Sequence, residues 1–205
     1  MRVDTKKIHQ VAGRVNILVV SHPFPAAKFK RIYHASEKTR WTDIAHGMCY
    51  IASGYVGDAH RPTFALRPGA SGEFAAKDDY ADNPFIAWYQ PKCSPYNTSQ
   101  IVYGDNLYTV YDQGFMTCHN ALTGEEMFGK VRFPQGGSFT ASPWAYNGRI
   151  FCLSEDGNTY VAKAGDQFEL LATNPLDELC IATPSVADGR LLLRTLSRLY
   201  CITGN

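Results

Sequence analysis

One stretch of the sequence decides the fold because it occurs in three related copies: Asn97-Thr98-Ser99-Gln100-Ile101-Val102-Tyr103-Gly104, Ala141-Ser142-Pro143-Trp144-Ala145-Tyr146-Asn147-Gly148 and Ala182-Thr183-Pro184-Ser185-Val186-Ala187-Asp188-Gly189. Their closing glycines lie 44 and 41 residues apart. No sustained 3.6-residue apolar stripe separates the copies, which excludes a helical repeat. The period is that of a four-stranded antiparallel unit.

Each copy continues into the same series of strands and turns. An apolar segment follows the turn, and the first two copies then carry a glycine seven residues after Leu107 and seven after Ile150. These glycines, Gly114 and Gly157, follow an aspartate closely, a combination typical of tight hairpins. The sequence therefore predicts an all-β protein of β-propeller-type four-stranded antiparallel blades.

Large aromatic residues mark the expected fourth strand. Phe128 follows the Thr123-Gly124 turn, and Trp41 follows Ser36–Arg40 at the same spacing. In stacked sheets such a ring packs between neighbours, and burying it contributes about 1.5 to 3 kcal/mol. We therefore expect Trp41 on the fourth strand of one unit and Phe128 on that of another.

These repeats resemble those of pyrroloquinoline-quinone-like (PQQ-like, or quinoprotein-like) β-propeller proteins. The resemblance rests on the phrases Ala-Ser-Pro-x-x-x-x-Gly-Arg-Ile, Glu-Asp-Gly-Asn-Thr-Tyr-Val, Thr-Gly-Glu-Glu and the closing Leu-Tyr-Cys-Ile. That superfamily includes quinoprotein alcohol dehydrogenases, a lipoprotein of outer-membrane protein assembly and many secreted propellers. The resemblance runs from about Trp41 to Ile202 and is strongest over the last hundred residues.

Length predicts a partial ring. At about 40 to 45 residues per blade, the chain holds about four blades in residues 41–205. Residues 1–40 match weakly and are interpreted as a degenerate blade or a closing strand. Because the last blade stops after its third strand, an edge is left open that could pair with another chain. A truncated product is the favoured explanation, beside closure by a second copy and a small open array.

Composition indicates a globular protein without the basic patch that is typical of nucleic-acid binding. Hydrophobic residues make up 45% of the chain and charged residues 19%, with a net charge of +1 and no long basic run. No apolar core follows Met1–Lys7, and Val15–Val20 is too short for a membrane span. The family resemblance implies a periplasmic or secreted location, although this chain shows no signal peptide.

The six cysteines are expected to be buried free thiols. Four of them, Cys49, Cys118, Cys152 and Cys201, fall in predicted strands, and no C-x-x-C pair suggests zinc. The vicinal cysteines that some quinoprotein dehydrogenases carry are absent from the sequence. The six histidines show no metal-binding spacing, and His46 is interpreted as a turn residue.

Four acidic residues, Asp112, Glu155, Asp156 and Asp188, raise the question of catalysis. All lie in predicted hairpin turns, where such side chains bond to the backbone. Trp144 could line a central channel, but a quinone site also needs a base and cation ligands. The sequence assigns no catalytic, cofactor-binding or metal-binding residue, and it predicts no cofactor.

One insertion interrupts the period. The turns at Gly47 and Gly104 are 57 residues apart, and the surplus maps to Val56–Asp82 as a loop. Long loops on propellers often carry the binding face. Five of its residues could contact a ligand: Arg61, Arg67, Asp78, Asp79 and Tyr80.

These observations favour a non-catalytic β-propeller repeat protein that serves as a binding or scaffold module. The expected partner is a protein or peptide, bound by strand addition at the open edge, or a second copy of the chain. The alternative is a fragment of a PQQ-dependent quinoprotein oxidoreductase acting on alcohols or sugars, which would use PQQ with calcium.

Overall fold

A computed structural model describes residues 14–20, 31–34, 39–53, 57, 59–70, 73–75 and 83–203. Within these ranges the regular structure consists of strands, with no helix. The strands form three four-stranded and two three-stranded antiparallel sheets. The all-β, four-stranded design predicted from the repeats is confirmed.

Four sheets follow one another in chain order. Each is a simple up-and-down meander, except that in the first a strand of another sheet comes before the last strand in sequence. Sheet I contains β3 (Thr39–Ala45), β4 (Met48–Ser53), β5 (Thr63–Leu66) and β7 (Ile86–Gln90). Sheet II contains β8 (Ile101–Tyr103), β9 (Asn106–Tyr111), β10 (Phe115–Asn120) and β11 (Glu126–Arg132). Sheet III contains β12 (Trp144–Tyr146), β13 (Arg149–Leu153), β14 (Asn158–Lys163) and β15 (Leu170–Pro175). Sheet IV contains β16 (Ser185–Ala187), β17 (Arg190–Arg194) and β18 (Leu199–Thr203).

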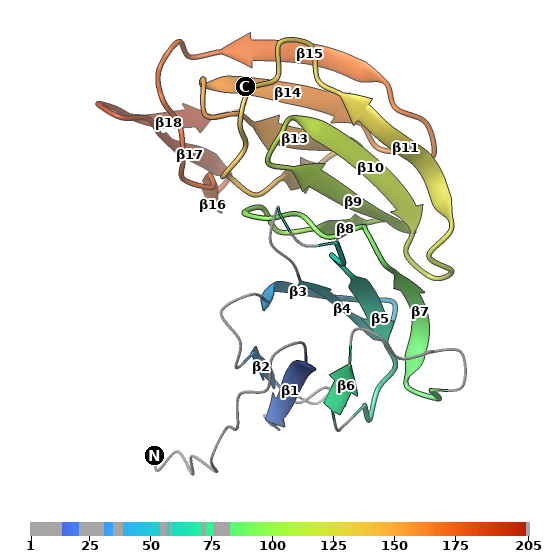
Figure 1. Cartoon of the computed structure of the whole chain (residues 1–205). Coiled ribbons are helices and arrows are strands. Elements are labelled where there is room, and N and C mark those ends of the chain that lie inside the picture. Colours follow the sequence, from blue (N-terminus) through green and yellow to red (C-terminus); the bar gives the residue numbers. More distant parts are fainter. Residues whose placement is uncertain are drawn as a thin grey trace, which may run out of the picture.

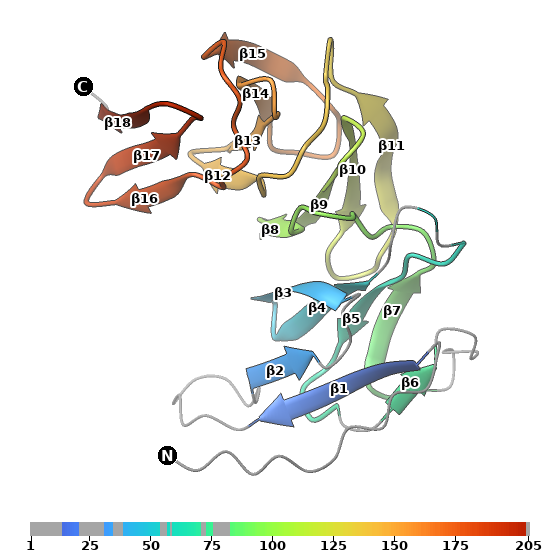
Figure 2. The same ribbon diagram turned by 60° about the vertical axis from the view of Figure 1, so that its left-hand side comes forward.

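The fifth sheet joins distant parts of the chain. It has the order β2-β1-β6 and contains β1 (Arg14–Val20), β2 (Arg31–His34) and β6 (Glu73–Ala75). Figures 1 and 2 show it beside sheet I, on the side away from sheet II. The first two of its strands come from the weakly matching segment 1–40, and the third comes from the insertion.

The sheets fan out along a curved, open arrangement (Figures 1 and 2). Their first strands approach one another, β3 next to β8 and β8 next to β12, so these strands form the inner side of the fan. Three of the turns after the first strand have positive φ at both central residues: His46-Gly47, Asn147-Gly148 and Asp188-Gly189. This is the type I′ geometry that suits two-residue hairpins. The prediction of His46 as a turn residue is confirmed.

The repeated stretch also links the sheets to each other. The backbone N–H of Ser99 donates to Ser142 Oγ at 2.9 Å, and the N–H of Ser142 donates to Thr183 Oγ1 at 2.9 Å. Each of these residues lies two positions before the first strand of its sheet, which is β8, β12 or β16. The hydroxyls of Ser142 and Thr183 therefore each satisfy a backbone donor of the preceding sheet's entry segment.

Apolar side chains fill the spaces between successive sheets. Buried clusters join sheet I to II, II to III and III to IV, as shown by the pairs Tyr50 with Leu107, Tyr108 with Ile150, and Leu153 with Leu193. Alternate residues of each strand point to the two neighbouring sheets. Phe128 packs against the cluster between sheets II and III, as predicted from its spacing.

Trp88 makes the equivalent contact between sheets I and II, and the sequence analysis missed it. Its ring lies against Gly124, where an added Cβ would be 2.7 Å from Trp88 Cδ2. Its Nε1 donates to the carbonyl of Ala121 at 2.7 Å, and Gln90 Nε2 donates to the carbonyl of Gly124 at 2.7 Å. Trp88 precedes Phe128 by one repeat period, a signal that the insertion before it obscured.

Two details of the expected strand assignment are wrong. Trp41 lies in β3, the first strand of sheet I, where it pairs with Ala52, and not on the fourth strand of a preceding unit. The segment Val56–Asp82 is not only a loop, because it contains the buried strand β5 and also β6, which pairs with β1. The spacing of one aromatic residue could not distinguish a fourth strand from a first.

Candidate interaction surface

Among the residues that the structure describes, no sheet covers one side of sheet IV. Leu193 and Tyr200 pack toward sheet III, so the alternate residues Leu192, Leu199 and Cys201 lie on the opposite side. We call these three residues the C-terminal face. Leu199 is 70% exposed and Cys201 is exposed.

Equivalent positions in the preceding sheets are covered by the next sheet. Leu192 pairs with Cys201 across β17 and β18, as Tyr108 pairs with Cys118 across β9 and β10. Both Tyr108 and Cys118 are fully buried. The C-terminal face therefore carries apolar residues at positions that the repeat buries elsewhere against a further sheet.

The burial expected for the cysteines holds at five of the six. Cys49, Cys93, Cys118, Cys152 and Cys180 are buried, whereas Cys201 is exposed. The expectation is wrong at Cys201 because, in the described part of the chain, nothing packs against that side of sheet IV. Sequence alone placed this residue correctly in a strand but could not show whether its side was covered.

The outer edge of β18 is the second open feature of this sheet. In sheets II and III the equivalent strands, β10 and β14, each pair with a fourth strand. Within residues described by the structure, β18 pairs only with β17. Its remaining backbone groups are thus free to pair with an added strand.

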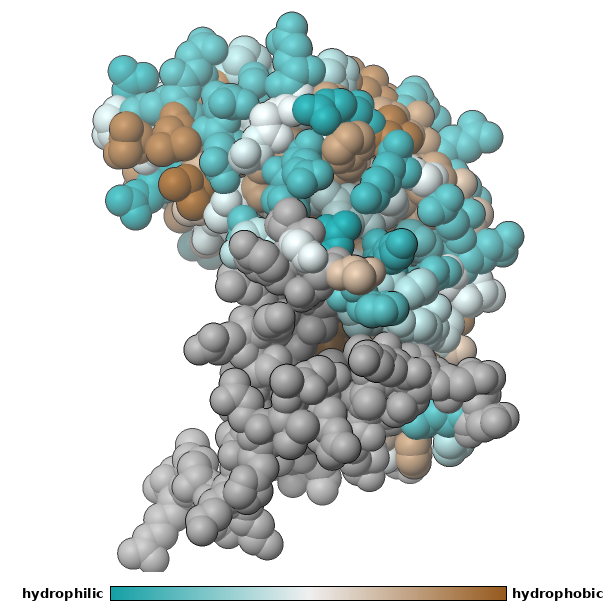
Figure 3. Space-filling view, in the orientation of Figure 1, coloured by the Kyte–Doolittle hydropathy of each residue, from teal (hydrophilic) through white to brown (hydrophobic). Residues whose placement is uncertain are grey.

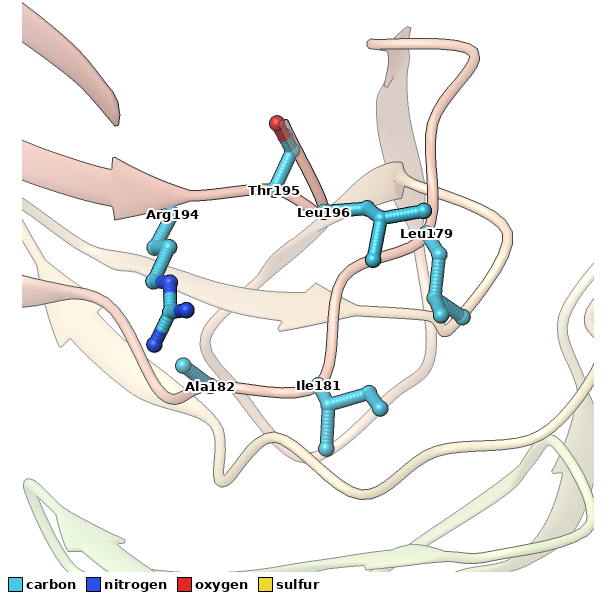
Figure 4. A pocket seen from close by; sticks show the side chains of 6 residues that line it. All are labelled: Leu179, Ile181, Ala182, Arg194, Thr195 and Leu196. Atoms are coloured by element: carbon cyan, nitrogen blue, oxygen red, sulfur yellow. The ribbon is translucent and has the colours of Figure 1, made fainter. Parts of the chain in front are cut away.

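A third feature lies at the rim of the same sheet. Leu179, Ile181 and Leu196, which we call the rim patch, are 40%, 53% and 73% exposed. With Ala182, Arg194 and Thr195 they line an open hollow of about 300 Å³ (Figure 4). The space-filling view shows apolar side chains gathered over the end of the molecule formed by sheet IV (Figure 3).

The acidic residues considered for catalysis occupy turns, as predicted, and Glu155 and Asp156 share one of them. Asp112, Glu155, Asp156 and Asp188 all lie in turns of sheets II to IV. Glu155 accepts a hydrogen bond from Thr140 Oγ1 at 2.6 Å, so it serves a local contact. Among the described residues no group of three or more His, Cys, Asp or Glu side chains is placed to hold a metal ion.

Trp144 does not offer an open indole surface on both sides. Its ring stacks on Phe151 with the centroids 5.3 Å apart and the planes 9° from parallel. One face of the indole is therefore already occupied by a side chain of β13.

The insertion residues that the structure describes have structural contacts. Arg67 Nη1 donates to the carbonyls of Pro84 and Ile86 at 3.1 and 2.7 Å. The Arg61 guanidinium lies over the ring of Tyr111 at 6.0 Å. The other three residues considered there, Asp78, Asp79 and Tyr80, lie outside the described residues.

A buried Cys–His pair was not found by sequence reasoning. Cys93 Sγ lies 3.5 Å from His119 Nδ1 between sheets I and II, and Gln100 Nε2 donates to Thr109 Oγ1 beside them at 2.7 Å. Burial raises the pKa of the Cys93 thiol. Burial also lowers the pKa of His119, against an opposing effect of the Glu126 carboxylate. Both groups are thus held neutral, which is the opposite of an activated thiolate and imidazolium.

The lowered pKa of His119 predicts that its contribution to the free energy of unfolding depends on pH. The pKa of His119 is lower in the folded chain than its ordinary value of 6.5, so below about pH 6.5 the unfolded chain binds a proton that the folded chain does not. We expect the stability advantage of the natural protein over a His119→Asn variant to shrink as the pH falls from 7 to 5. Urea unfolding at each pH measures it. A constant difference across that range would contradict the prediction.

Comparisons with known proteins address the fold. No family model matches the sequence, and no curated protein matches it either. Among solved structures, BamB from Moraxella catarrhalis superposes with a TM-score of 0.55 at 14% identity, over 75% of this chain and 39% of that one. The fold is that of a β-propeller. The chain spans about two fifths of the BamB chain.

Two further solved structures support the same fold. The computationally designed Ika4 protein has a TM-score of 0.58 at 7% identity, covering 82% of this chain and 93% of that one. Glutaminyl cyclase from Myxococcus xanthus has a TM-score of 0.51 at 11% identity, covering 92% and 72%. Identities this low show the shared architecture. The described ranges contain no helix that is long and apolar enough to cross a membrane.

Proposed function

We propose that this chain is a PQQ-like β-propeller protein that acts as a non-catalytic binding or scaffold module. It binds another protein through the C-terminal face and the free edge of β18. The observation that carries the proposal is that Leu192 and Cys201 stand at repeat positions whose counterparts, Tyr108 and Cys118, are fully buried by the next sheet. Apolar residues that are exposed, as Cys201 is, or half-buried, as Leu192 is, at such positions favour contact with a further β-sheet.

A second copy of the chain is the sheet-bearing partner available to the purified protein. The C-terminal face offers apolar contact, and β18 offers unpaired backbone groups to an added strand. Under the proposal no cofactor, nucleic acid or membrane span takes part. The proposal is supported by the repeat pattern, by the exposure of the C-terminal face and by the apolar character of its residues.

Self-association should therefore depend on Leu199. We expect light scattering to report masses above the 22.8 kDa monomer as concentration rises, and a shift toward the monomer for Leu199→Lys. Leu199 is 70% exposed, so the change adds charge to the face without disturbing the core. Leu122→Lys is the matched control, because Leu122 is 48% exposed in a turn of sheet II, away from the face.

Cys201 provides an independent readout of the same contact. It is exposed while the other five thiols are buried, so one thiol per chain should react rapidly with a thiol reagent. That reaction should slow at concentrations where the chain associates and should be absent in Cys201→Ser. A chain that stays monomeric, with Cys201 labelling independent of concentration, would contradict self-association. Alcohol-dependent dye reduction after addition of PQQ and calcium would instead support the quinoprotein oxidoreductase alternative.

A further inference from the structure

The rim patch differs from its counterpart one repeat earlier in side chains but not in backbone. The N–H of Leu196 donates to the carbonyl of Leu179 at 2.9 Å. The N–H of Glu155 donates to the carbonyl of Ser138 at 2.8 Å, and both residues precede their counterparts by 41 positions. The same backbone hydrogen bond, between the linker before a sheet and a hairpin of that sheet, thus occurs in both copies.

The earlier copy is polar at all three positions. Where the rim patch has Leu179, Ile181 and Leu196, the earlier copy has Ser138, Thr140 and Glu155. There Thr140 Oγ1 donates to Glu155 Oε1 at 2.6 Å. Because the backbone bond forms with either set, folding does not require apolar residues at the rim, and their exposure has an energetic cost.

Continuation of the fan would not cover the three apolar residues of this site. Ser138 is exposed although sheets III and IV both follow it in the structure, and Thr140 is only half-buried. The equivalent residues Leu179 and Ile181 would accordingly stay at the surface if another sheet packed on sheet IV. The three apolar residues of the rim patch are therefore distinct from the C-terminal face, whereas Arg194, which lines the same hollow, borders that face because it pairs with Leu199 across β17 and β18.

One positive charge borders the apolar residues. Arg194 lines the hollow, and Figure 4 shows its side chain beside Ala182, across the opening from Leu179 and Leu196. In the part of the chain that the structure describes, no carboxylate forms an ion pair with Arg194. A partner that fits would place aliphatic side chains in the hollow and a carboxylate against this guanidinium.

We propose that the rim patch binds an extended segment of a partner protein in which large aliphatic residues alternate with acidic ones. The proposal rests on the binding-module function and adds a second contact, whose three apolar residues are separate from the C-terminal face. The aliphatic residues supply the buried area, and the guanidinium selects acidic over basic segments.

A fluorescent synthetic peptide that alternates leucine and aspartate is the probe, and its lysine analogue is the control peptide. Fluorescence anisotropy should show binding of the acidic peptide and weaker binding of the basic one. The triple variant Leu179→Ser, Ile181→Thr, Leu196→Glu places the side chains of the earlier copy on the same backbone. It should weaken binding by about tenfold or more.

Three further variants keep the test decisive. Leu196→Glu alone changes a residue that is 73% exposed, so it should fold and still weaken binding. Arg194→Gln should remove the preference for the acidic peptide, whereas Leu122→Ser should bind as the natural protein does. Equal binding by the natural protein and the triple variant, or no binding of the acidic peptide at all, would overturn the rim-patch proposal.

The same assay separates this proposal from the proposed function. Leu196→Glu should weaken peptide binding and leave self-association intact, because Leu196 lies outside the C-terminal face. Self-association without peptide binding would remove only the rim patch. Peptide binding by a chain that never associates would remove only the C-terminal face as a site of self-association.

Discussion

Replacement of Gly124 by alanine is expected to destabilise the protein by about 2 to 5 kcal/mol. Two costs combine. Gly124 has a φ of +75°, a left-handed conformation that costs a residue with a Cβ about 1 to 2 kcal/mol. The new methyl group would also lie 2.7 to 2.9 Å from three atoms of the Trp88 ring, which could move only by breaking its hydrogen bond to Ala121.

Gly148→Ala separates these two costs. Gly148 has a nearly identical φ of +72°, and an added Cβ would meet no heavy atom within 4 Å. We expect it to cost about 1 to 2 kcal/mol, the backbone part alone. Urea unfolding of both variants measures the difference. Equal losses would contradict the close packing of the Trp88 ring on Gly124.

Phe133→Ala is expected to cost about 3 to 5 kcal/mol. Phe133 is 1% exposed and lies in the linker that follows sheet II. Its ring stacks on Tyr160 at 4.9 Å and contacts Phe139 at 5.4 Å and Phe168 at 5.9 Å. Truncation would leave a cavity among three aromatic rings that hold sheet III against the linker.

Tyr146→Ala is the matched control for that change. Tyr146 is an aromatic residue of β12 but is 73% exposed, so its loss should change stability by no more than about 0.5 kcal/mol. Thermal and urea unfolding with two spectroscopic probes would measure both variants. A Phe133→Ala loss as small as that of Tyr146→Ala would contradict the role given to the aromatic cluster.

The repeating fold could be predicted from sequence because its signals are local. Turns such as Asn147-Gly148 require positive φ, which Asn and Gly tolerate, and the alternating apolar strands follow directly. The position of Phe128 between sheets could also be predicted, since the Thr123-Gly124 turn fixes its distance along the chain. These features depend on residues within a few positions of one another.

Other features depend on residues that are distant in sequence. Strand β6 pairs with β1 although β2 and three strands of sheet I lie between them in sequence, and no local pattern predicts this pairing. The contact between Cys93 and His119 arises where two sheets meet. The exposure of Cys201 could not be predicted either, because its strand pattern is that of Cys118 and only the neighbouring sheet distinguishes them.

The candidate surfaces were partly accessible to sequence reasoning. The open edge of the last unit follows from counting its strands, and β18 occupies the place expected for a third strand. The rim patch was missed because Leu179, Ile181 and Leu196 fall in a linker and a hairpin, where no periodic pattern is expected. Aligning them with Ser138, Thr140 and Glu155 would have revealed the change from polar to apolar.

The meander order of sheets II, III and IV has a consequence for biosynthesis. Every strand in them pairs only with its neighbours in sequence, so each sheet is complete as soon as its own residues have left the ribosome. The growing polypeptide would acquire its sheets one at a time, each using the previous one as a template. Assembly during translation would thus be vectorial, with the sheet that bears the exposed thiol forming after sheets II and III.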